Sequence, residues 1–422
     1  MASDIAHVQA FLLAANEATS PANTGNKTLT SRWYNGLLTL VRITFTLGSI
    51  SIAVIDCADI IMISLESVNE NTPFVISMVQ MFWVTFYESR SASVLALFTW
   101  CHLARWRALR TFVRAKMMEP LNHRNAKQSS DIRRLSWMLF LISFGLRASN
   151  MAFSWLQTEG LLEDPKNFSL NLTSCYSWFD RCVSRETFIL VETFLVDWPF
   201  ILSQQVLISG LIFVWIALKS MRKLRREVAT NLTVTSSDEV PSSERIENWT
   251  LSYVNMSRFV QYFNGCFGRI LLVSVGLDVL TVLGVCAKLL ASGKTLSMMI
   301  WLRYAWVSVI FLSYATICYL PFILLHEESL KLDRILRDFA WTLNGHGEER
   351  SIVTKEEISA DLTALQEKVN KLSLIVKENP LTIEAGGLFQ FSRTSLVTIV
   401  TTVVTALLLT KEILNRSMPA RF

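Results

Sequence analysis

Charged residues are scarce in this sequence: Asp, Glu, Lys and Arg make up only 18% of the 422 residues. A water-soluble domain of this length would carry more charge and shorter apolar runs. The five histidines are scattered without the spacing of metal ligands, so no metal site is expected. Because the chain also lacks a phosphate-binding glycine loop, a nucleophile motif and a paired acid and base, we expect neither an enzyme nor a cofactor.

Hydrophobic residues, by contrast, make up 51% of the chain, and the mean hydropathy is +0.36. Crossing the hydrocarbon core of a bilayer takes about 20 apolar residues in a helix. No basic segment precedes the short apolar patch at 11–15, so a cleaved signal peptide is not expected. The sequence predicts an all-α membrane protein with seven transmembrane helices, at about 36–64, 74–104, 135–158, 186–218, 258–290, 297–326 and 388–413.

Basic residues lie unevenly between these spans. The loop over 66–72 contains no Lys or Arg, whereas basic residues are frequent at 105–134 and 219–226. Cytoplasmic loops carry the excess of Lys and Arg, so we expect the N-terminus inside and the C-terminus outside, the reverse of a G-protein-coupled receptor. Since these arginines flank spans rather than form a binding domain, no nucleic-acid partner is expected.

The loop between the third and fourth spans contains two glycosylation sequons, at Asn167 and Asn171, followed by Cys175 and Cys182. Glycan addition and disulfide formation both take place on the oxidising side of the membrane. We therefore predict that this loop is extracellular, with glycans at both asparagines and a disulfide between the two cysteines. The other five cysteines fall within spans, where a small buried residue is the ordinary role.

Two stretches of the cytoplasmic part contain turn-forming residues. The polar stretch 227–257 includes a Ser- and Pro-containing run at 236–243 and predicts a linker. The helix of the sixth span is expected to continue past residue 326 and to break at the Asn-Gly-His-Gly run of 344–347.

A further helix is predicted from the capping-box pattern at 354–357 to Pro380, and Gly386 and Gly387 interrupt the chain after it. Its apolar residues recur at steps of four and three. This stripe fits packing within one subunit or association of several subunits, and the sequence leaves both open; its members are Ile358, Leu362, Leu365, Val369, Leu372 and Val376.

Threonines recur along the last span. At about 3.6 residues per turn they share one face, whose members are Thr394, Thr398, Thr401, Thr402, Thr405, Leu409 and Glu412. The other side is aliphatic. A hydroxyl can bond back to its own helix, and small polar residues can pack helices together. A wall along a water-filled pore is the third explanation, and five threonines with a carboxylate at the outer end favour it.

The segment from Gly387 to Leu396, followed by Thr405, resembles the C-terminal signature of the arthropod gustatory and odorant receptor superfamily. That signature ends in Thr-Tyr, five apolar residues and Gln-Phe. Here Ala406 replaces the tyrosine, Glu412 the glutamine and Ile413 the phenylalanine, which is similar to divergent invertebrate members. The inverted seven-span topology and the cytoplasmic helix after the sixth span extend the resemblance along the chain.

The resemblance implies a tetrameric, ligand-gated, non-selective cation channel whose last helix lines the pore and whose cytoplasmic helices hold the subunits together. Carried over by position, Leu409 and Ile413 become candidates for an aliphatic gate that blocks ions by dewetting, with Glu412 attracting cations at the mouth. The alternative for Glu412 is a place at the extracellular interface beside Lys411.

Ionisable residues also lie within the other spans, where each one costs free energy unless it is paired or hydrated. Aromatic walls with a few fixed charges are typical of a small-molecule pocket, and the related receptors bind ligands in this region. Charge pairs such as Arg147 with Asp197 could instead lock helices together. The candidate ligand-binding residues are Trp83, Tyr87, Arg147, Trp155, Glu192, Asp197, Trp198, Tyr304 and Trp306.

We therefore expect a chemoreceptor in the plasma membrane of a sensory neuron, opened by a small molecule and working as a homo- or hetero-tetramer, with or without a co-receptor. The rival hypotheses are a metabotropic receptor for chemicals, light or peroxide, a transporter, and a modulatory subunit. The expected divisions are a cytoplasmic segment at 1–35, six spans at 36–326, a cytoplasmic anchor at 327–386, a pore helix at 387–414 and an extracellular tail at 415–422.

Overall fold

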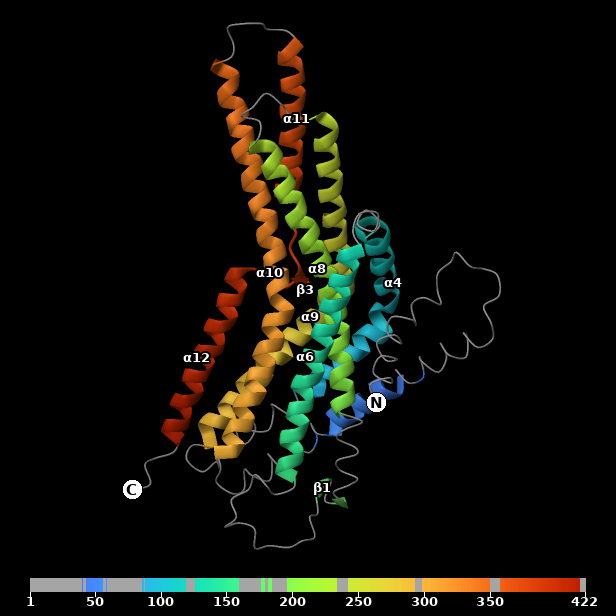
Figure 1. Cartoon of the computed structure of the whole chain (residues 1–422). Helices are drawn as coiled ribbons and strands as arrows, with labels where there is room; N and C mark the ends of the chain where they lie inside the picture. Colours follow the sequence, from blue (N-terminus) through green and yellow to red (C-terminus); the bar gives the residue numbers. More distant parts are fainter. Residues whose placement is uncertain are drawn as a thin grey trace, which may run out of the picture.

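Long helices make up nearly all of the described structure, a computed structural model of the chain (Figure 1). It describes residues 40, 43–55, 58, 86, 88–118, 126–158, 176–178, 181–183, 196–233, 242–292, 298–349 and 357–417.

Helices cover residues 43–55 and 88–96, and several of the elements that follow are labelled in Figure 1. In chain order these elements are the π-helix η2 (Leu97–His102), α4 (Leu103–Phe112), the π-helix η3 (Val113–Met118), α6 (Ala126–Thr158), β1 (Tyr176–Trp178), β2 (Arg181–Val183), α8 (Trp198–Thr233), α9 (Ser243–Ser292), α10 (Met298–Glu349), α11 (Glu357–Glu378), β3 (Glu384–Ala385), β4 (Phe389–Gln390) and α12 (Arg393–Ser417).

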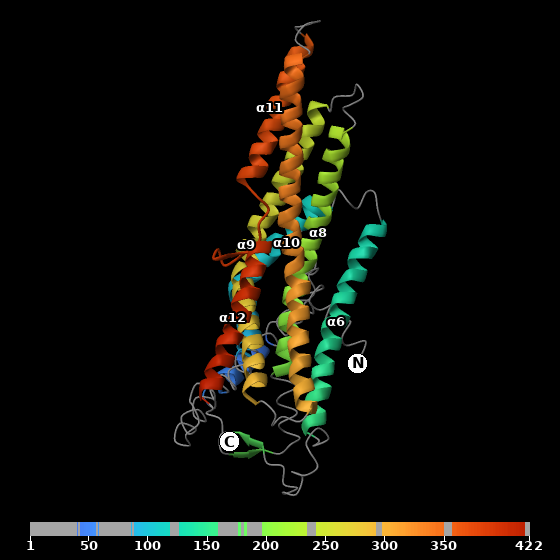
Figure 2. The same cartoon turned by 90° about the vertical axis from the view of Figure 1, so that its left-hand side faces the viewer.

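The molecule is elongated, and three helices, α8, α9 and α10, run along most of its length. Figures 1 and 2 both show α11 beside these helices in the upper part and α6 and α12 in the lower part. The four strands form two short antiparallel hairpins, β1 with β2 and β3 with β4. The second hairpin lies in the connection between α11 and α12.

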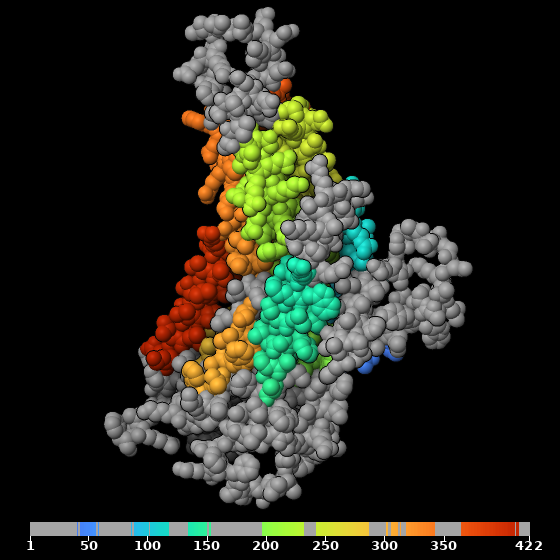
Figure 3. Space-filling view, viewed as in Figure 1, coloured from blue at the N-terminus to red at the C-terminus, as the bar shows by residue number. Residues whose placement is uncertain are grey.

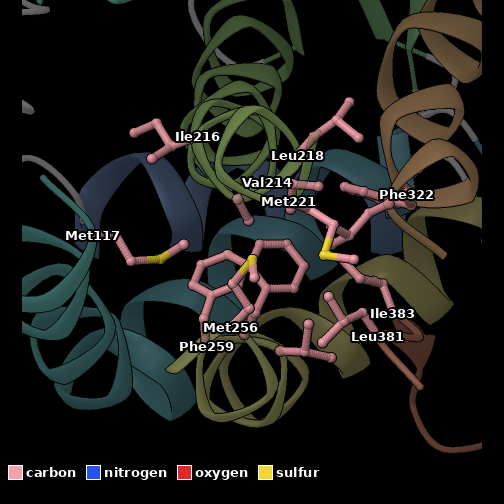
Figure 4. Close-up of a cluster of buried hydrophobic side chains, with 14 of the residues drawn as sticks. Met117, Val214, Ile216, Leu218, Met221, Met256, Phe259, Phe322, Leu381 and Ile383 are labelled. Carbon is pink, nitrogen blue, oxygen red and sulfur yellow. The ribbon is translucent and has the colours of Figure 1, made fainter. Parts of the chain in front are cut away.

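One large hydrophobic core joins the helices, and α9 contributes a ladder of aromatic rings to it. Phe263 stacks on Phe267 with ring centroids 4.9 Å apart and meets Phe322 of α10 edge-on. Figure 4 shows Leu381 and Ile383, from the connection between α11 and α12, packed in the same cluster as Phe322. Each fully buried side chain of this size contributes about 1.5–3 kcal/mol, so the connection is held by the core itself.

Wherever the structure describes them, the predicted spans coincide with helices, except for residues 388–392 at the start of the last span. Within the described residues, two helical stretches, Trp198–Asn231 and Ser243–Cys286, are long and apolar enough to cross a membrane, and Ile43–Ile55 and Arg393–Leu409 are shorter apolar helices. The third, sixth and seventh predicted spans lie in α6, α10 and α12, and the last of these begins at Arg393 rather than at 388.

The predicted linker at 227–257 is wrong over most of its length. α8 continues to Thr233 and α9 begins at Ser243. Ile246, Trp249 and Tyr253 are buried along one side of α9, and Val228 of α8 is buried as well. Spacings of three and four residues make an apolar stripe in this stretch, and that stripe outweighs its many polar residues.

The predicted break at 344–347 is also wrong, because α10 continues through it to Glu349. A glycine in a helix costs only about 1 kcal/mol relative to alanine, and extending an existing helix is cooperative. Two glycines near the end of a 52-residue helix are therefore too weak to end it. α10 crosses residue 326 unbroken, as the sequence predicted.

The apolar stripe of α11 is buried within its own chain. Leu365, Val369, Leu372 and Val376 are each at most 5% exposed, and α11 packs against α9 and α10. Of the two explanations that the sequence left open, packing within one subunit is confirmed for these four residues.

Candidate functional site

The last helix, α12, packs on the rest of its own chain along one side and exposes the others. Its half-buried residues are Ser395, Ile399, Val403, Ala406 and Leu407, which are spaced as one helical face, and the helix packs against α9. The helix stands at the margin of the bundle in the space-filling view (Figure 3).

The threonine face of α12 is one of the exposed sides. Thr394, Thr398, Thr401, Thr402 and Thr405 are all exposed, as are Leu409 and Glu412. The Thr398 hydroxyl also donates a 3.0 Å hydrogen bond to the Thr394 carbonyl, so the backbone bond expected of a membrane threonine is present at this position. The face nevertheless points away from the subunit, which rules out packing between helices of one chain as its explanation.

A second exposed side of α12 is aliphatic. Val397, Val404 and Leu408 are 64%, 50% and 62% exposed. An exposed apolar patch of this kind marks contact with lipid or with protein. On the side predicted to be aliphatic, Val403 and Leu407 lie on the packed face, whereas Leu396 and Val400 are exposed. Ile413 belongs to α12, and its side chain lies outside the described part.

Hydrogen bonds fix the connection between α11 and α12 to the neighbouring helices. The buried Tyr253 hydroxyl of α9 donates a 2.8 Å bond to the Asn379 carbonyl and lies 2.9 Å from the Ser329 hydroxyl. Burial raises the pKa of Tyr253 to about 12, so the hydroxyl stays protonated and able to donate. The Asn264 side chain donates to the Thr382 carbonyl and accepts from the Glu384 amide, both at 3.1 Å.

Close approach of backbones adds to this fixation. A Cβ on Gly268 of α9 would lie 3.2 Å from the Glu384 carbonyl oxygen, so any side chain here would press against the backbone of the hairpin. Gly386 and Gly387 have φ of +63° and +74°, the left-handed region that glycine enters without strain. The interruption predicted at these two glycines is confirmed, and the chain turns there. At the start of α12, Arg393 forms an ion pair with Glu327 of α10.

Two buried ion pairs flank one aromatic ring in the lower part of the bundle. Arg147 of α6 pairs with Asp197 just before α8, and Arg90 pairs with Asp278 of α9. Both guanidinium groups lie over the Phe200 ring, at 5.1 Å for Arg147 and 5.5 Å for Arg90. All four charged side chains are at most 7% exposed, so each pair neutralises its own charge in a site without solvent.

The predicted ligand-binding residues divide into those that the structure places and those that it does not. Arg147 and Asp197 meet directly, as the helix-locking alternative requires, and Trp306 donates a 2.9 Å bond to Ser149 of α6. Trp198 begins α8 and is half-buried. Trp155 and Tyr304 belong to α6 and α10, with side chains outside the described part. Trp83, Tyr87 and Glu192 lie outside the described residues.

The predicted extracellular features stay predictions. Asn167, Asn171 and Cys175 lie outside the described residues, and Cys182 lies in β2, opposite Ser177 of β1.

At the other end of the molecule, α10 and α11 border an open groove of ≈ 410 Å³. Trp341 of α10 is 80% exposed, and Leu374 of α11 is 53% exposed beside it. The groove is lined by Arg337, Ala340, Trp341, Asn370, Ser373, Leu374 and Lys377.

Sequence reasoning missed the partners that surround the buried charges. Tyr319 of α10 and Ser274 of α9 both hydrogen-bond to Asp278. With the Gln204 amide assigned so that its oxygen faces Arg90, it accepts bonds of 2.9 and 3.0 Å from that guanidinium. These residues come from different helices, so no local spacing in the sequence predicts that they meet. The sequence indicated only that Arg90 and Asp278, as charged residues inside predicted spans, need partners.

The fold is that of solved insect olfactory receptors. The chain is similar to the olfactory receptor OR5 from Machilis hrabei in complex with eugenol, with a TM-score of 0.64 at 12% identity over 97% of this chain and 100% of that one. It is similar to the same receptor in a second structure, with a TM-score of 0.60 at 12% identity over 96% and 98% of the two chains. A comparison with curated proteins finds no match.

Residues 18–409 match the family model described as 7tm Chemosensory receptor. The chain therefore belongs to this family of chemosensory receptors, and the resemblance seen in the last thirty residues is confirmed over nearly its whole length. This is a family of receptors, in agreement with the expectation that the chain is not an enzyme.

Proposed function

We propose that the protein is a gustatory receptor-like subunit of a ligand-gated, non-selective cation channel in the plasma membrane, opened by a small molecule. The observation that carries this proposal is the threonine face of α12, which is exposed while the opposite side of the helix packs on α9. Hydroxyls in a row on an exposed helix face suit a water path shared with other subunits.

In the proposed channel, four copies of α12 surround a central axis with their threonine faces inward. Leu409 and Ile413 form the narrow aliphatic part that excludes water when closed, and Glu412 draws cations to the outer mouth. The N-terminus and α11 are cytoplasmic, and the sequons at Asn167 and Asn171 face outward. This orientation rests on the distribution of basic residues.

The exposed Trp341 and Leu374 beside the groove between α10 and α11 support association of subunits at the cytoplasmic end. Large exposed hydrophobic side chains at a groove are typical of protein contact sites. The partner is a second copy of the chain or a related co-receptor subunit.

The small molecule is proposed to bind between α6, the start of α8 and α10, near Phe200 and Trp306. These helices place aromatic and aliphatic side chains around two ion pairs whose charges cancel, and a small cluster of Phe200, Val285, Val307 and Ile310 is buried there. Such a site favours a ligand without net charge.

Whole-cell recording from cells that express the chain tests the proposal, with tastants, peroxide and light applied in turn. Ligand-evoked cation current is the expected result. Second-messenger signals without current would support a metabotropic receptor instead, and substrate uptake without conductance would support a transporter. Current only after a related receptor is co-expressed would identify a modulatory subunit.

Single cysteines along α12 test the pore face directly. Cysteine at Thr398, Thr402 or Thr405 should react with a charged thiol reagent and alter the current. Val400 and Val404 are the matched controls, because they are also exposed in the single chain but lie away from the threonine face. Equal reaction on both sides would contradict the assignment. Glu412→Gln should weaken permeation or block by divalent cations.

A further inference from the structure

Tyr319 of α10 lies between the buried charges and the start of α12, and it contacts both. Its hydroxyl donates a 3.2 Å hydrogen bond to Asp278 Oδ2. Asp278 is the ion-pair partner of Arg90, and Ser274 lies 3.4 Å from the same carboxylate oxygen. A hydrogen bond to an ionised carboxylate away from water is stronger than a bond between neutral groups, so the phenol is firmly oriented.

The ring of the same residue stacks on Phe391, with centroids 5.3 Å apart and an interplanar angle of 27°. Phe391 is 3% exposed and also meets Phe322 edge-on at 5.0 Å. It directly precedes Ser392, whose hydroxyl accepts a 3.2 Å bond from the Ser395 amide in the first turn of α12. Phe391 is therefore a buried residue that holds the chain just before α12 begins at Arg393.

α10 is weakened at this point by Pro321, two residues beyond Tyr319. A proline inside a helix removes the hydrogen bond to the carbonyl four residues earlier, here that of Ile317. Helices bend preferentially at such positions, so the two halves of α10 can change their relative direction close to Tyr319.

We propose that Tyr319 couples movement of the helices that bear Arg90 and Asp278 to the start of α12, and so acts as a positioning residue for opening. When α9 shifts relative to α10, the Asp278 carboxylate moves the phenol, the ring turns against Phe391, and Phe391 moves the first turn of α12. The inference rests on the proposed channel function and adds to it a specific residue through which ligand binding reaches the pore helix.

The test is a double-mutant cycle on the ligand concentration that half-activates the channel. Tyr319→Phe removes only the hydroxyl, and Phe391→Leu removes the ring that stacks on Tyr319 and also meets Phe322. Each change should shift half-activation by about fivefold or more, the usual lower range of coupling between sites. Because the hydroxyl acts through the ring contact, the double variant should show the shift of the larger single change rather than the product of both.

Tyr262→Phe is the matched control, since Tyr262 of α9 is half exposed and its ring lies beside Phe112. It should leave half-activation unchanged, and surface labelling of all variants checks that each reaches the membrane. Multiplying shifts, or no shift in Tyr319→Phe while the wild type conducts, would overturn the coupling and leave the channel intact. A wild type that conducts neither alone nor with a related receptor would overturn the channel function and the coupling with it.

Discussion

α11 and α12 are neighbours in the sequence, similar in length and both amphipathic, yet their surroundings differ completely. α11 has 22 residues and α12 has 25. The stripe of α11 is buried in its own chain, whereas most large aliphatic residues of α12 are exposed. Apolar patterning therefore tells which face of a helix will be covered, and it does not tell whether the same chain, another chain or lipid covers it.

The largest expected contrast between the two helices comes from shortening one leucine in each. Leu372→Ala in α11 should lower the free energy of unfolding by about 2–5 kcal/mol, because a side chain 1% exposed leaves a cavity. Leu408→Ala in α12 should change it by less than about 0.5 kcal/mol in the isolated subunit. Thermal unfolding of the detergent-solubilised protein measures both, and equal losses would mean that α12 packs as tightly as α11.

The next largest difference is expected between the two glycines that join these helices, in how much an alanine substitution destabilises the protein. At Gly386 a Cβ would lie 2.7 Å from Leu272 Cδ2, whereas at Gly387 nothing lies within 4 Å. Gly387→Ala should therefore cost only the backbone strain of a positive φ, about 1–2 kcal/mol, and Gly386→Ala should cost more, because it adds a clash. Unfolding of the two variants side by side tests this order, and a greater loss in Gly387→Ala would contradict it.

Removing the Tyr253 hydroxyl tests how firmly the connection is held on the α11 side. Tyr253→Phe leaves the Asn379 carbonyl without this donor and should cost about 1–3 kcal/mol. Since the folded-state pKa is raised to about 12, the contribution is full below the ordinary tyrosine pKa of about 10 and is lost as the pH rises through 12.

Stability measured from neutral to alkaline pH should therefore fall in the wild type and fall less in Tyr253→Phe. If the stability of both proteins fell equally with rising pH, the loss would come from a group other than Tyr253.

The smallest effect is expected at the surface, where Lys368 of α11 meets Glu247 of α9 with Nζ and Oε1 2.6 Å apart. The hydrogen bond from Lys368 and its charge lower the pKa of Glu247. The pair therefore contributes above the ordinary pKa of the carboxyl and loses that contribution as the pH falls through the lowered value.

Lys368→Met should lower the melting temperature less than any variant above, and high salt should remove the difference because the pair is exposed to solvent. A loss that persists in high salt would indicate packing by the lysine stem instead.

Patterns within single helices were predicted well from the sequence. The stripe of α11, the threonine face of α12 and the interruption at Gly386 all follow from local spacing or from glycine. Of the contacts between distant segments, the pairing of Arg147 with Asp197 was anticipated as an alternative, from the cost of a lone buried charge, and the others could not be predicted. In the sequence, Tyr319 is indistinguishable from the other aromatic residues of an apolar span. Its hydrogen-bond partner Asp278 lies 41 residues before it, so no local pattern links the two. The linker at 227–257 was misjudged because polar residues outnumber the few apolar ones that are buried.

The Asn264 side chain, which bonds the backbone on both sides of Ile383, acts on the connection as a neighbouring β-strand would. Surface loops usually tolerate added residues, but here the Thr382 carbonyl and the Glu384 amide both bond to the side chain of Asn264 on α9. A single inserted residue would shift Ile383 out of the core and change the orientation of α12 relative to α11. Epitope tags and fluorescent reporters should therefore be attached elsewhere, because the number of residues in this connection fixes how α11 and α12 are placed relative to each other.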